Sequence, residues 1–180
     1  MNSYFMRVED INEILPGQLF MSDITTAENL DVLHRLSITH IVSCTKIEPR
    51  HPDKFTYKQL PVDDTSEEDI KKYFKMAVKF IESAIENEGG VVLVHCAAGI
   101  SRSGAVVCAY LMYKNRWSFD RAWEYGKQKR DKMYPNLNFQ KQLRAYQLDL
   151  GIEMSEEEQK KIKAFEEMES RINSKDYQYQ

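Results

Sequence analysis

The 180-residue sequence has few cysteines and lacks any long apolar run. No stretch approaches the roughly 20 apolar residues that cross a bilayer, so we expect no membrane partner. The first residues contain no apolar signal-peptide region, and Asn2 does not fit the N-myristoylation pattern. Cys44, Cys96 and Cys108 are an odd number of cysteines, which is typical of free thiols in a reducing compartment. We therefore expect a cytoplasmic protein, with the nucleus as an alternative location.

Neither sign of charge is in large excess. The formal net charge is -3, with 29% charged and 42% hydrophobic residues. This balance is typical of a globular domain with one core, and it argues against a nucleic-acid partner held by electrostatics. The sequence has no internal repeat and no low-complexity tract, and its length suits one domain with a short extension.

Strand patterns alternate with helix patterns over the first 150 residues. We predict strands at 18–21, 38–44, 57–62 and 91–94, helices at 25–36 and 69–86, and further helices after Arg102, Ser118 and Asn136. Thr25, with Glu28 three residues later, is the expected N-cap of the 25–36 helix. The run 91–94 is apolar without alternation, as in a strand buried on both faces. The pattern predicts an α/β fold with a mainly parallel central sheet flanked by helices.

The composition changes after about Gly151, where charged residues become dense. Ser155 and Glu158 have the spacing of a capping box, which predicts the start of a helix. A narrow apolar stripe follows at helical spacing, formed by Ile162, Phe165, Met168 and Ile172. We therefore predict a domain over 1–150 and a charged helical extension with a disordered end over 151–180. We expect the stripe to dock on its own domain, with dimerisation or protein binding as the second alternative and a solvated helix as the third.

One loop has the residue types that nucleophilic phosphate chemistry needs. It joins the strand that ends at His95 to the helix that begins near Arg102, and its members are Ala97, Ala98, Gly99, Ile100 and Ser101. Such a loop can point successive backbone N–H groups at a tetrahedral anion, and the guanidinium of Arg102 can hold two of its oxygen atoms. Cys96 lies at the base of this loop, where the helix dipole, the N–H groups and Arg102 favour its thiolate. A thiolate under a bound phosphate is the arrangement for covalent phosphoryl transfer.

The leaving oxygen needs a proton, so a carboxylic acid must reach the loop. Asp64 lies between the predicted strand 57–62 and the helix 69–86, and Asp63 is the competing candidate. Ser103 can donate a hydrogen bond to the sulfur of Cys96 while phosphocysteine breaks down, although it could also only cap a helix. We find no cluster of side chains with metal-ligand spacing, and we predict neither a metal nor a cofactor.

Four further side chains have structural interpretations that compete with functional ones. We interpret His95 as a core imidazole bonded to the backbone, with a secondary effect on Cys96, and not as a general base. Asn136 is expected to cap a helix and to brace the loop, and Cys108 to pack in the core. Cys44 ends a strand that we predict to run parallel to the strand before Cys96, so both thiols lie at one sheet edge. Cys44 could trap oxidised Cys96 as a disulfide, or it could simply pack in the core.

The motif His95-Cys96-x5-Arg102-Ser103-Gly104 resembles that of the cysteine-based protein tyrosine phosphatases, and the details resemble the dual-specificity branch. Matches in the same order cover about residues 10–150: Leu19-Phe20-Met21-Ser22, Ala27-x-Asn29-Leu30, Leu36-Ser37-Ile38-Thr39-His40-Ile41-Val42, Asp64-x8-Tyr73-Phe74 and Pro135-Asn136-x-x-Phe139-x-x-Gln142-Leu143. Ser43 stands where the family often has Asn. The resemblance implies a five-stranded sheet, a shallow phosphate pocket, Asp64 as the general acid and Ser103 in a catalytic role.

The resemblance also implies hydrolysis of phosphotyrosine and phosphoserine/threonine monoesters in proteins through a phosphocysteine intermediate. The residues between Cys96 and Arg102 are uncharged. Phosphatases of phosphoinositides or of RNA 5′-triphosphates would place more positive charge there, so lipid and RNA phosphates are the alternative substrates. A phospho-binding pseudophosphatase, the alternative from another class, would lack the nucleophile that Cys96 supplies.

Overall fold

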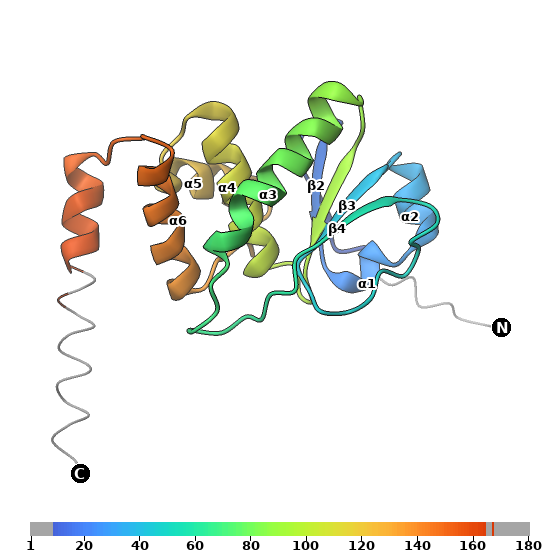
Figure 1. Cartoon of the computed structure of the whole chain (residues 1–180), viewed down its shortest axis with the longest axis horizontal. Coiled ribbons are helices and arrows are strands. Elements are labelled where there is room, and N and C mark those ends of the chain that lie inside the picture. The colour runs from blue at the N-terminus through green and yellow to red at the C-terminus, as the bar shows by residue number, and fades with distance from the viewer. Residues whose placement is uncertain (1–8, 165–166, 168–180) are drawn as a thin grey trace, which may run out of the picture.

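The computed structural model describes residues 9–164 and 167, which form a five-stranded sheet with helices on both faces (Figure 1). The strands are β1 (Ile11–Leu15), β2 (Leu19–Ser22), β3 (His40–Ser43), β4 (Thr56–Gln59) and β5 (Val92–His95). Their order across the sheet is β1-β2-β5-β3-β4. Only β1 is antiparallel to its neighbour, so the predicted mainly parallel sheet is confirmed.

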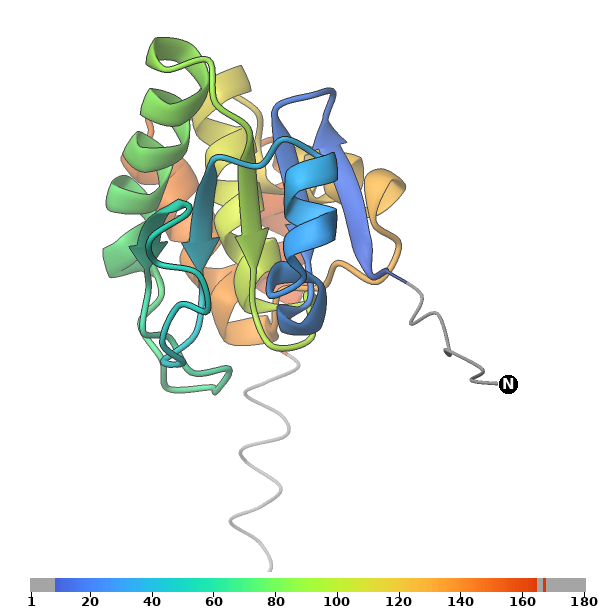
Figure 2. The same cartoon turned by 90° about the vertical axis from the view of Figure 1, so that its right-hand side faces the viewer.

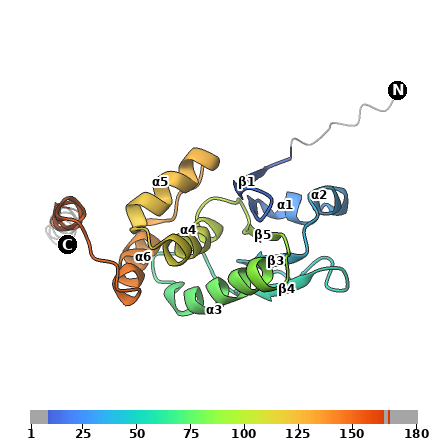
Figure 3. The same cartoon turned by 90° about the horizontal axis from the view of Figure 1, so that it is seen from above.

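Two short helices cover one face of the sheet, and four longer helices cover the other (Figures 2 and 3). The short ones are α1 (Ile24–Ala27) and α2 (Leu30–Arg35). The longer ones are α3 (Lys71–Glu82), α4 (Arg102–Asn115), α5 (Phe119–Lys129) and α6 (Leu137–Asp149). A π-helical turn, η1 (Ser83–Asn87), extends α3, and Gly89 follows it with φ of 61°.

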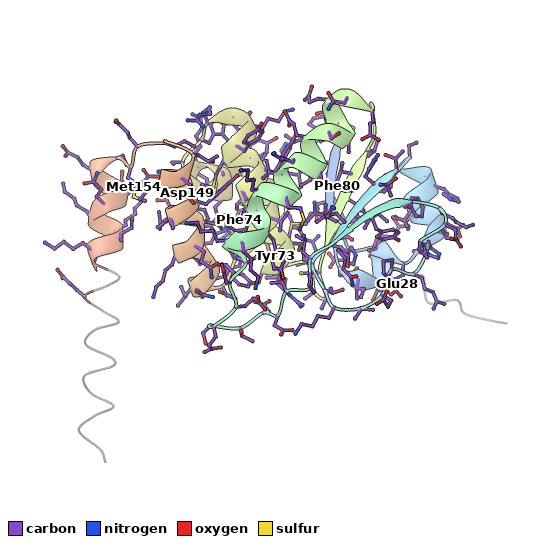
Figure 4. The ribbon with its side chains drawn as sticks, viewed as in Figure 1. Glu28, Tyr73, Phe74, Phe80, Asp149 and Met154 are labelled. Atoms are coloured by element: carbon purple, nitrogen blue, oxygen red, sulfur yellow. The ribbon has the colours of Figure 1, made fainter. Side chains whose placement is uncertain are left out.

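The sheet separates two apolar cores. The smaller one lies under α1 and α2 and includes Leu33, Ile41 and Leu93, while the larger one lies under the four longer helices. Helix α4 is the centre of the larger core, because every residue from 103 to 112 is buried. Helix α3 packs beside α4, and its Phe74 (Figure 4) also reaches α6, where the ring centroid of Tyr146 lies 5.2 Å away. The central strands therefore bury both faces, as the uninterrupted apolar run of β5 predicted.

The predicted helix 25–36 is wrong in two respects. It begins earlier, because Asp23 and not Thr25 caps it by accepting a hydrogen bond of 2.8 Å from Thr26 N. It is also divided at Asn29, whose side chain accepts hydrogen bonds from Asp31 N and Val32 N and starts a second helix. Asparagine favours such a cap over a helix interior, because its side chain competes for backbone N–H groups.

Strand β1 was not predicted from the sequence. Its only buried residue is Ile14, so it has no apolar alternation to reveal it. It belongs to the sheet through its register with β2, in which Ile11 pairs with Ser22 and Asn12 with Met21. An edge strand of this kind is defined by a tertiary partner and not by its own pattern.

The parallel register brings three loops to one edge of the sheet. Ser22 at the end of β2, His95 at the end of β5 and Ser43 at the end of β3 are aligned. The residues that follow them directly are, in the same order, Asp23, Cys96 and Cys44. Ligand sites of parallel α/β sheets lie at this carboxyl edge. Within the described residues, none of the helices has the length and apolarity that crossing a membrane requires.

Candidate active site

The loop between β5 and α4 is held in place through its carbonyl groups. Ala97 O accepts a hydrogen bond of 3.2 Å from Ile24 N, and Ile100 O accepts one of 3.1 Å from Tyr134 N. Gly99 O accepts a bond of 2.8 Å from Arg130 Nε. Gly99 has φ of 63°, and a Cβ at this position would lie 2.5 Å from Ser22 O. The curl therefore requires glycine, both for its backbone angle and for the space that it leaves.

Surrounding residues bind the carbonyl groups of the loop, so its N–H groups remain available to a ligand. In the part of the chain that the structure describes, the backbone N–H groups of residues 97–101 donate to no other group. Arg102 begins helix α4, and its Nη1 donates to Val62 O at 3.2 Å. Arg102 Nε is buried and has no hydrogen-bond partner among the described residues. Free amides at the start of a 14-residue helix, together with this guanidinium, form a site for a tetrahedral anion.

Cys96 lies at the base of the loop with only 1% of its surface exposed. Ser103 Oγ donates a hydrogen bond of 3.1 Å to Cys96 Sγ, and Ser103 itself is fully buried. The base of the loop therefore holds a buried sulfur with a hydroxyl donor beside it.

The structure distinguishes the two candidate acids by their positions. Asp64 Oδ1 accepts hydrogen bonds of 2.7 Å from Ser101 Oγ and 2.8 Å from Asn136 Nδ2, and Asp64 Oδ2 lies 3.8 Å from Arg102 Nε. Asp63 turns away from the loop and forms an ion pair with Lys46. Of these two carboxylates, Asp64 is therefore the one that contacts the anion-binding loop.

His95 is a buried imidazole on the last residue of β5, with 6% exposure. Burial lowers its pKa to about 4, although the backbone of Cys96 acts in the opposite direction. His95 is therefore neutral at pH 7. Its Nδ1 has no hydrogen-bond partner among the described residues, so the expected bond from this nitrogen to the backbone is not present.

The other two thiols are also buried, and none of the three cysteines forms a disulfide. Cys44 N donates to His95 O at 2.8 Å, which places Cys44 directly beside the base of the loop. Burial raises the pKa of Cys44 well above its ordinary value, and the nearby Cys96 raises it further, while Arg102 lowers it. Cys108 is fully buried in α4, and burial likewise raises its pKa. Cys108 is thus a packing residue, whereas Cys44 adjoins the site.

Asn136 was expected to cap a helix and brace the loop, but the contacts of two other side chains, Ser101 and Arg130, were not foreseen from the sequence. Ser101 Oγ donates to Asp64 and also accepts a bond of 3.1 Å from Asn136 N, so it joins the loop to both partners. Asn136 in turn caps α6 by accepting from Phe139 N at 2.9 Å. Arg130 is the second, because its buried guanidinium holds the carbonyl of Gly99. No local motif marks Arg130, which lies in a basic stretch that looks like an exposed helix end.

A strand–loop–helix anion site with a buried thiol and an adjacent carboxylate defines a cysteine-based phosphatase. The family described as "Dual specificity phosphatase, catalytic domain" matches residues 19–149. The chain is 41% identical over 140 residues to Dual specificity protein phosphatase 1B of Arabidopsis thaliana, covering 77% of this chain and 83% of that protein. It is 42% identical over 132 residues to human Dual specificity protein phosphatase 1, covering 73% of this chain but 35% of that protein.

Solved structures agree with the sequence comparisons. The human tyrosine phosphatase-like serine/threonine/tyrosine-interacting protein is similar with a TM-score of 0.74 and 35% identity, covering 79% of this chain and 98% of that chain. The structure of DUSP15 has a TM-score of 0.72 and 34% identity, covering 83% and 99% of the two chains. The chain belongs to the dual specificity protein phosphatase family, and the resemblance inferred from the motif is confirmed. It has the catalytic domain of a protein phosphatase, a hydrolase that acts on phosphorylated proteins.

Proposed function

We propose that this chain hydrolyses phosphotyrosine and phosphoserine/threonine monoesters of proteins through a phosphocysteine on Cys96. The observation that carries the proposal is that the backbone N–H groups of residues 97–101 donate to no other group of the described chain, in the loop that directly follows Cys96. These groups and Arg102 stabilise the equatorial oxygens of the transferring phosphoryl group in a fixed geometry. No charged side chain lies between Cys96 and Arg102, which favours a single phosphate over a polyphosphate or an inositol phosphate.

In the first step, the thiolate of Cys96 attacks phosphorus and the bond from phosphorus to the leaving oxygen breaks. Asp64 gives its proton to that oxygen. Because Asp64 Oδ1 already accepts two hydrogen bonds, the proton is carried on Oδ2, the oxygen nearer Arg102. Ser101 and Asn136 therefore fix which carboxyl oxygen acts as the acid.

In the second step, Asp64 takes a proton from water, and the water oxygen attacks phosphorus. The bond from phosphorus to sulfur breaks, and its electron pair returns to Cys96. Ser103 donates a hydrogen bond to the sulfur as the negative charge develops there, which is the role that the 3.1 Å contact supports. His95 is neutral and buried, so it serves as a structural support of the loop.

The test is Cys96→Ser, assayed on phosphotyrosine and phosphothreonine peptides and on a small aryl phosphate. Serine is nearly isosteric but is not ionised at neutral pH, so turnover is expected to fall to a few per cent or less of wild type, with vanadate binding and melting temperature retained. The matched control is Cys108→Ala, which removes a buried thiol away from the loop and is expected to retain turnover. Turnover by Cys96→Ser similar to wild type would reject the nucleophile, and an absolute requirement for a divalent metal after EDTA treatment would reject the mechanism.

We also propose that the extension after Gly151 docks on its own domain. The capping box is present, since Ser155 N donates to Glu158 Oε2 at 2.8 Å and Glu158 N donates to Ser155 Oγ at 3.2 Å. Glu158 is buried, and Lys161 lies 3.7 Å from Asp120 of α5. These polar contacts favour intramolecular docking over dimerisation.

Of the apolar stripe, Ile162 lies within the described residues and is half-buried, whereas Phe165, Met168 and Ile172 lie outside them. The extension holds no residue of the site, so truncation at Gly151 is expected to leave kcat/KM on a small aryl phosphate unchanged. A large loss of kcat/KM at unchanged melting temperature would overturn the boundary between 1–150 and 151–180.

The three buried free thiols are compatible with the cytoplasm or nucleus, which we propose as the location.

A further inference from the structure

Helix α3 lies beside the edge strand β4 (Figure 1). Side chains of these two elements line a shallow, open groove of about 560 Å³. Its lining consists of four lysines and two apolar side chains: Lys58, Lys72, Lys75, Met76, Lys79 and Phe80. Among the described residues, no acidic side chain contributes to this lining. The groove is therefore positively charged with an apolar floor, in a chain whose net charge is -3.

The helical repeat explains why these side chains form one row. Lys72, Lys75 and Lys79 are three to four residues apart, so they share one face of α3. Met76 lies on the same face and is 39% exposed, while the opposite face of α3 is buried in the core. Lys58 completes the groove from β4, where its Nζ lies 5.8 Å from the ring centroid of Phe80 (Figure 4).

Most of this positive charge has no counter-charge among the residues that the structure describes. Lys58, Lys75 and Lys79 form no ion pair with any carboxylate of the described chain, and Lys72 approaches only Glu68, at 3.5 Å. The acidic residue at the end of α3 is engaged elsewhere, because Glu82 accepts a hydrogen bond of 2.9 Å from Tyr110. Uncompensated like charges on one face repel one another and attract an anionic partner.

One end of the groove, at Lys72, lies near the loop that carries Asp64, with Glu68 between them. Lys72 contacts Glu68, and Glu68 Oε2 accepts a hydrogen bond of 3.1 Å from the backbone N of Asp63. Asp64 is the next residue, so the groove begins beside the acid loop. From Lys72 to Phe80 the helix rises about 12 Å, which is the length of about four extended residues.

We propose that this groove binds an acidic segment of the phosphorylated protein substrate, with carboxylates on the lysines and an apolar side chain against Met76 and Phe80. The proposal rests on the proposed function, because the bound segment flanks the residue that is dephosphorylated. The groove thereby selects substrates by charge at a distance from the phosphate. Such charge complementarity mainly affects encounter and KM, and it weakens as salt is added.

The test uses two peptides with the same phosphotyrosine core. One has an extension rich in Asp and Glu with one Leu, the other has a Ser/Gly extension, and each is made with the extension on either side. At low ionic strength, wild type is expected to prefer the acidic peptide in kcat/KM by about tenfold in at least one orientation. Lys75→Glu/Lys79→Glu is expected to abolish this preference and to leave kcat/KM on p-nitrophenyl phosphate within about twofold of wild type.

The matched control is Lys160→Glu/Lys163→Glu on the extension, which changes the net charge equally at exposed positions. It is expected to keep the preference, and Lys75→Gln/Lys79→Gln is expected to reduce it by an intermediate amount. An equal preference in the groove variant and wild type would overturn the proposal. The proposal would also be overturned if Lys75→Glu/Lys79→Glu and Lys75→Gln/Lys79→Gln lost kcat/KM on p-nitrophenyl phosphate by the same factor. The groove would then not be separate from the chemistry.

Direct binding separates failure of the groove from failure of the proposed function. Fluorescence anisotropy of the unphosphorylated acidic peptide needs no turnover, and its affinity is expected to fall about tenfold in Lys75→Glu/Lys79→Glu. No difference in affinity would overturn the groove while leaving the phosphatase mechanism intact. Binding to phosphatidylserine vesicles without binding to the peptide would also overturn the proposal, because the occupant would then be a lipid surface.

Discussion

Arg130 is expected to support both the stability and the rate of this phosphatase, although it does not contact the sulfur. Its side chain is completely buried. Its Nε holds Gly99 O at 2.8 Å, its Nη1 holds Asn12 Oδ1 at 2.6 Å, and its Nη2 lies 2.9 Å from Asp10 Oδ1. Arg130 thus fastens the anion-binding loop to the edge of the sheet.

Arg130→Met removes the charge at similar length. It leaves the carbonyl of Gly99 without a partner, which costs about 1–3 kcal/mol. Removing one member of a fully buried ion pair costs about 3–5 kcal/mol. Asp10 is 29% exposed and also pairs with Lys132, so the ion pair contributes less than a fully buried one, and we expect a total loss of about 2–4 kcal/mol. For a chain of this size, that loss lowers the melting temperature by about 4–16 °C.

The activity of Arg130→Met is expected to fall as well, because the amide groups of the loop lose the contact that aims them. A displacement of about 1 Å in such groups costs about 10²-fold in rate, so a loss of about 10- to 100-fold in kcat is expected at a temperature where the variant is folded. The measurement combines thermal unfolding with kcat and KM on an aryl phosphate. Arg130→Lys retains a cation and is expected to recover part of both losses.

The matched control is Arg144→Met. Arg144 also pairs with an aspartate, Asp120, at 2.7 Å, and it lies 4.9 Å from the ring centroid of Phe119, but its side chain is 19% exposed and away from the loop. This control is expected to lose stability without losing kcat. If Arg130→Met were destabilised and kept its kcat, the connection to the loop would be refuted. If it lost no stability, the reasoning from buried hydrogen bonds would be refuted.

Three further predictions concern the chemistry, the pH dependence and the redox behaviour of the site. Asp64→Asn is expected to lower kcat on the order of 10²–10³-fold for alkyl phosphates and less for aryl phosphates with acidic phenols, because good leaving groups need no proton. If Asp63→Asn showed that pattern instead, the acid would be misassigned. Because the pKa of His95 is about 6.5 in the unfolded chain and about 4 in the folded protein, the unfolded chain binds the proton first as the pH falls. His95 should therefore contribute a loss of about 3 kcal/mol between pH 6.5 and pH 4, and urea unfolding of His95→Gln should show a smaller decrease over that range than wild type. A decrease of the same size in both proteins would contradict this account. Mild peroxide is expected to inactivate the enzyme reversibly, and Cys44→Ser to impair recovery with a thiol reductant. Peptide mapping of oxidised protein without a disulfide between Cys44 and Cys96 would leave Cys44 as a packing residue.

The sequence by itself determined the class of the protein, because the anion site is local in the chain. Cys96 and Arg102 are six positions apart, and a buried strand before them and a helix after them are sufficient to place both around one loop. The parallel sheet was also predictable, because β5 is apolar at successive positions and helices separate the strands. The same reasoning placed Cys44 near Cys96, since parallel strands end at a common edge.

The tertiary structure alone decided how the loop is supported. The residues by themselves left Asp63 and Asp64 open as the acid, and the family resemblance pointed to Asp64, which is the carboxylate that contacts the loop. Arg130 contacts Asn12, a residue 118 positions away, and Asn136 contacts Asp64, 72 positions away. Such pairs form only when the chain packs, because neither partner carries a local pattern that identifies the other. The edge strand β1 is of the same kind, since its single buried residue gives no signal until β2 is beside it. The groove between α3 and β4 likewise exists only after folding, when Lys58 is brought beside lysines that follow it in the chain by 14 positions or more.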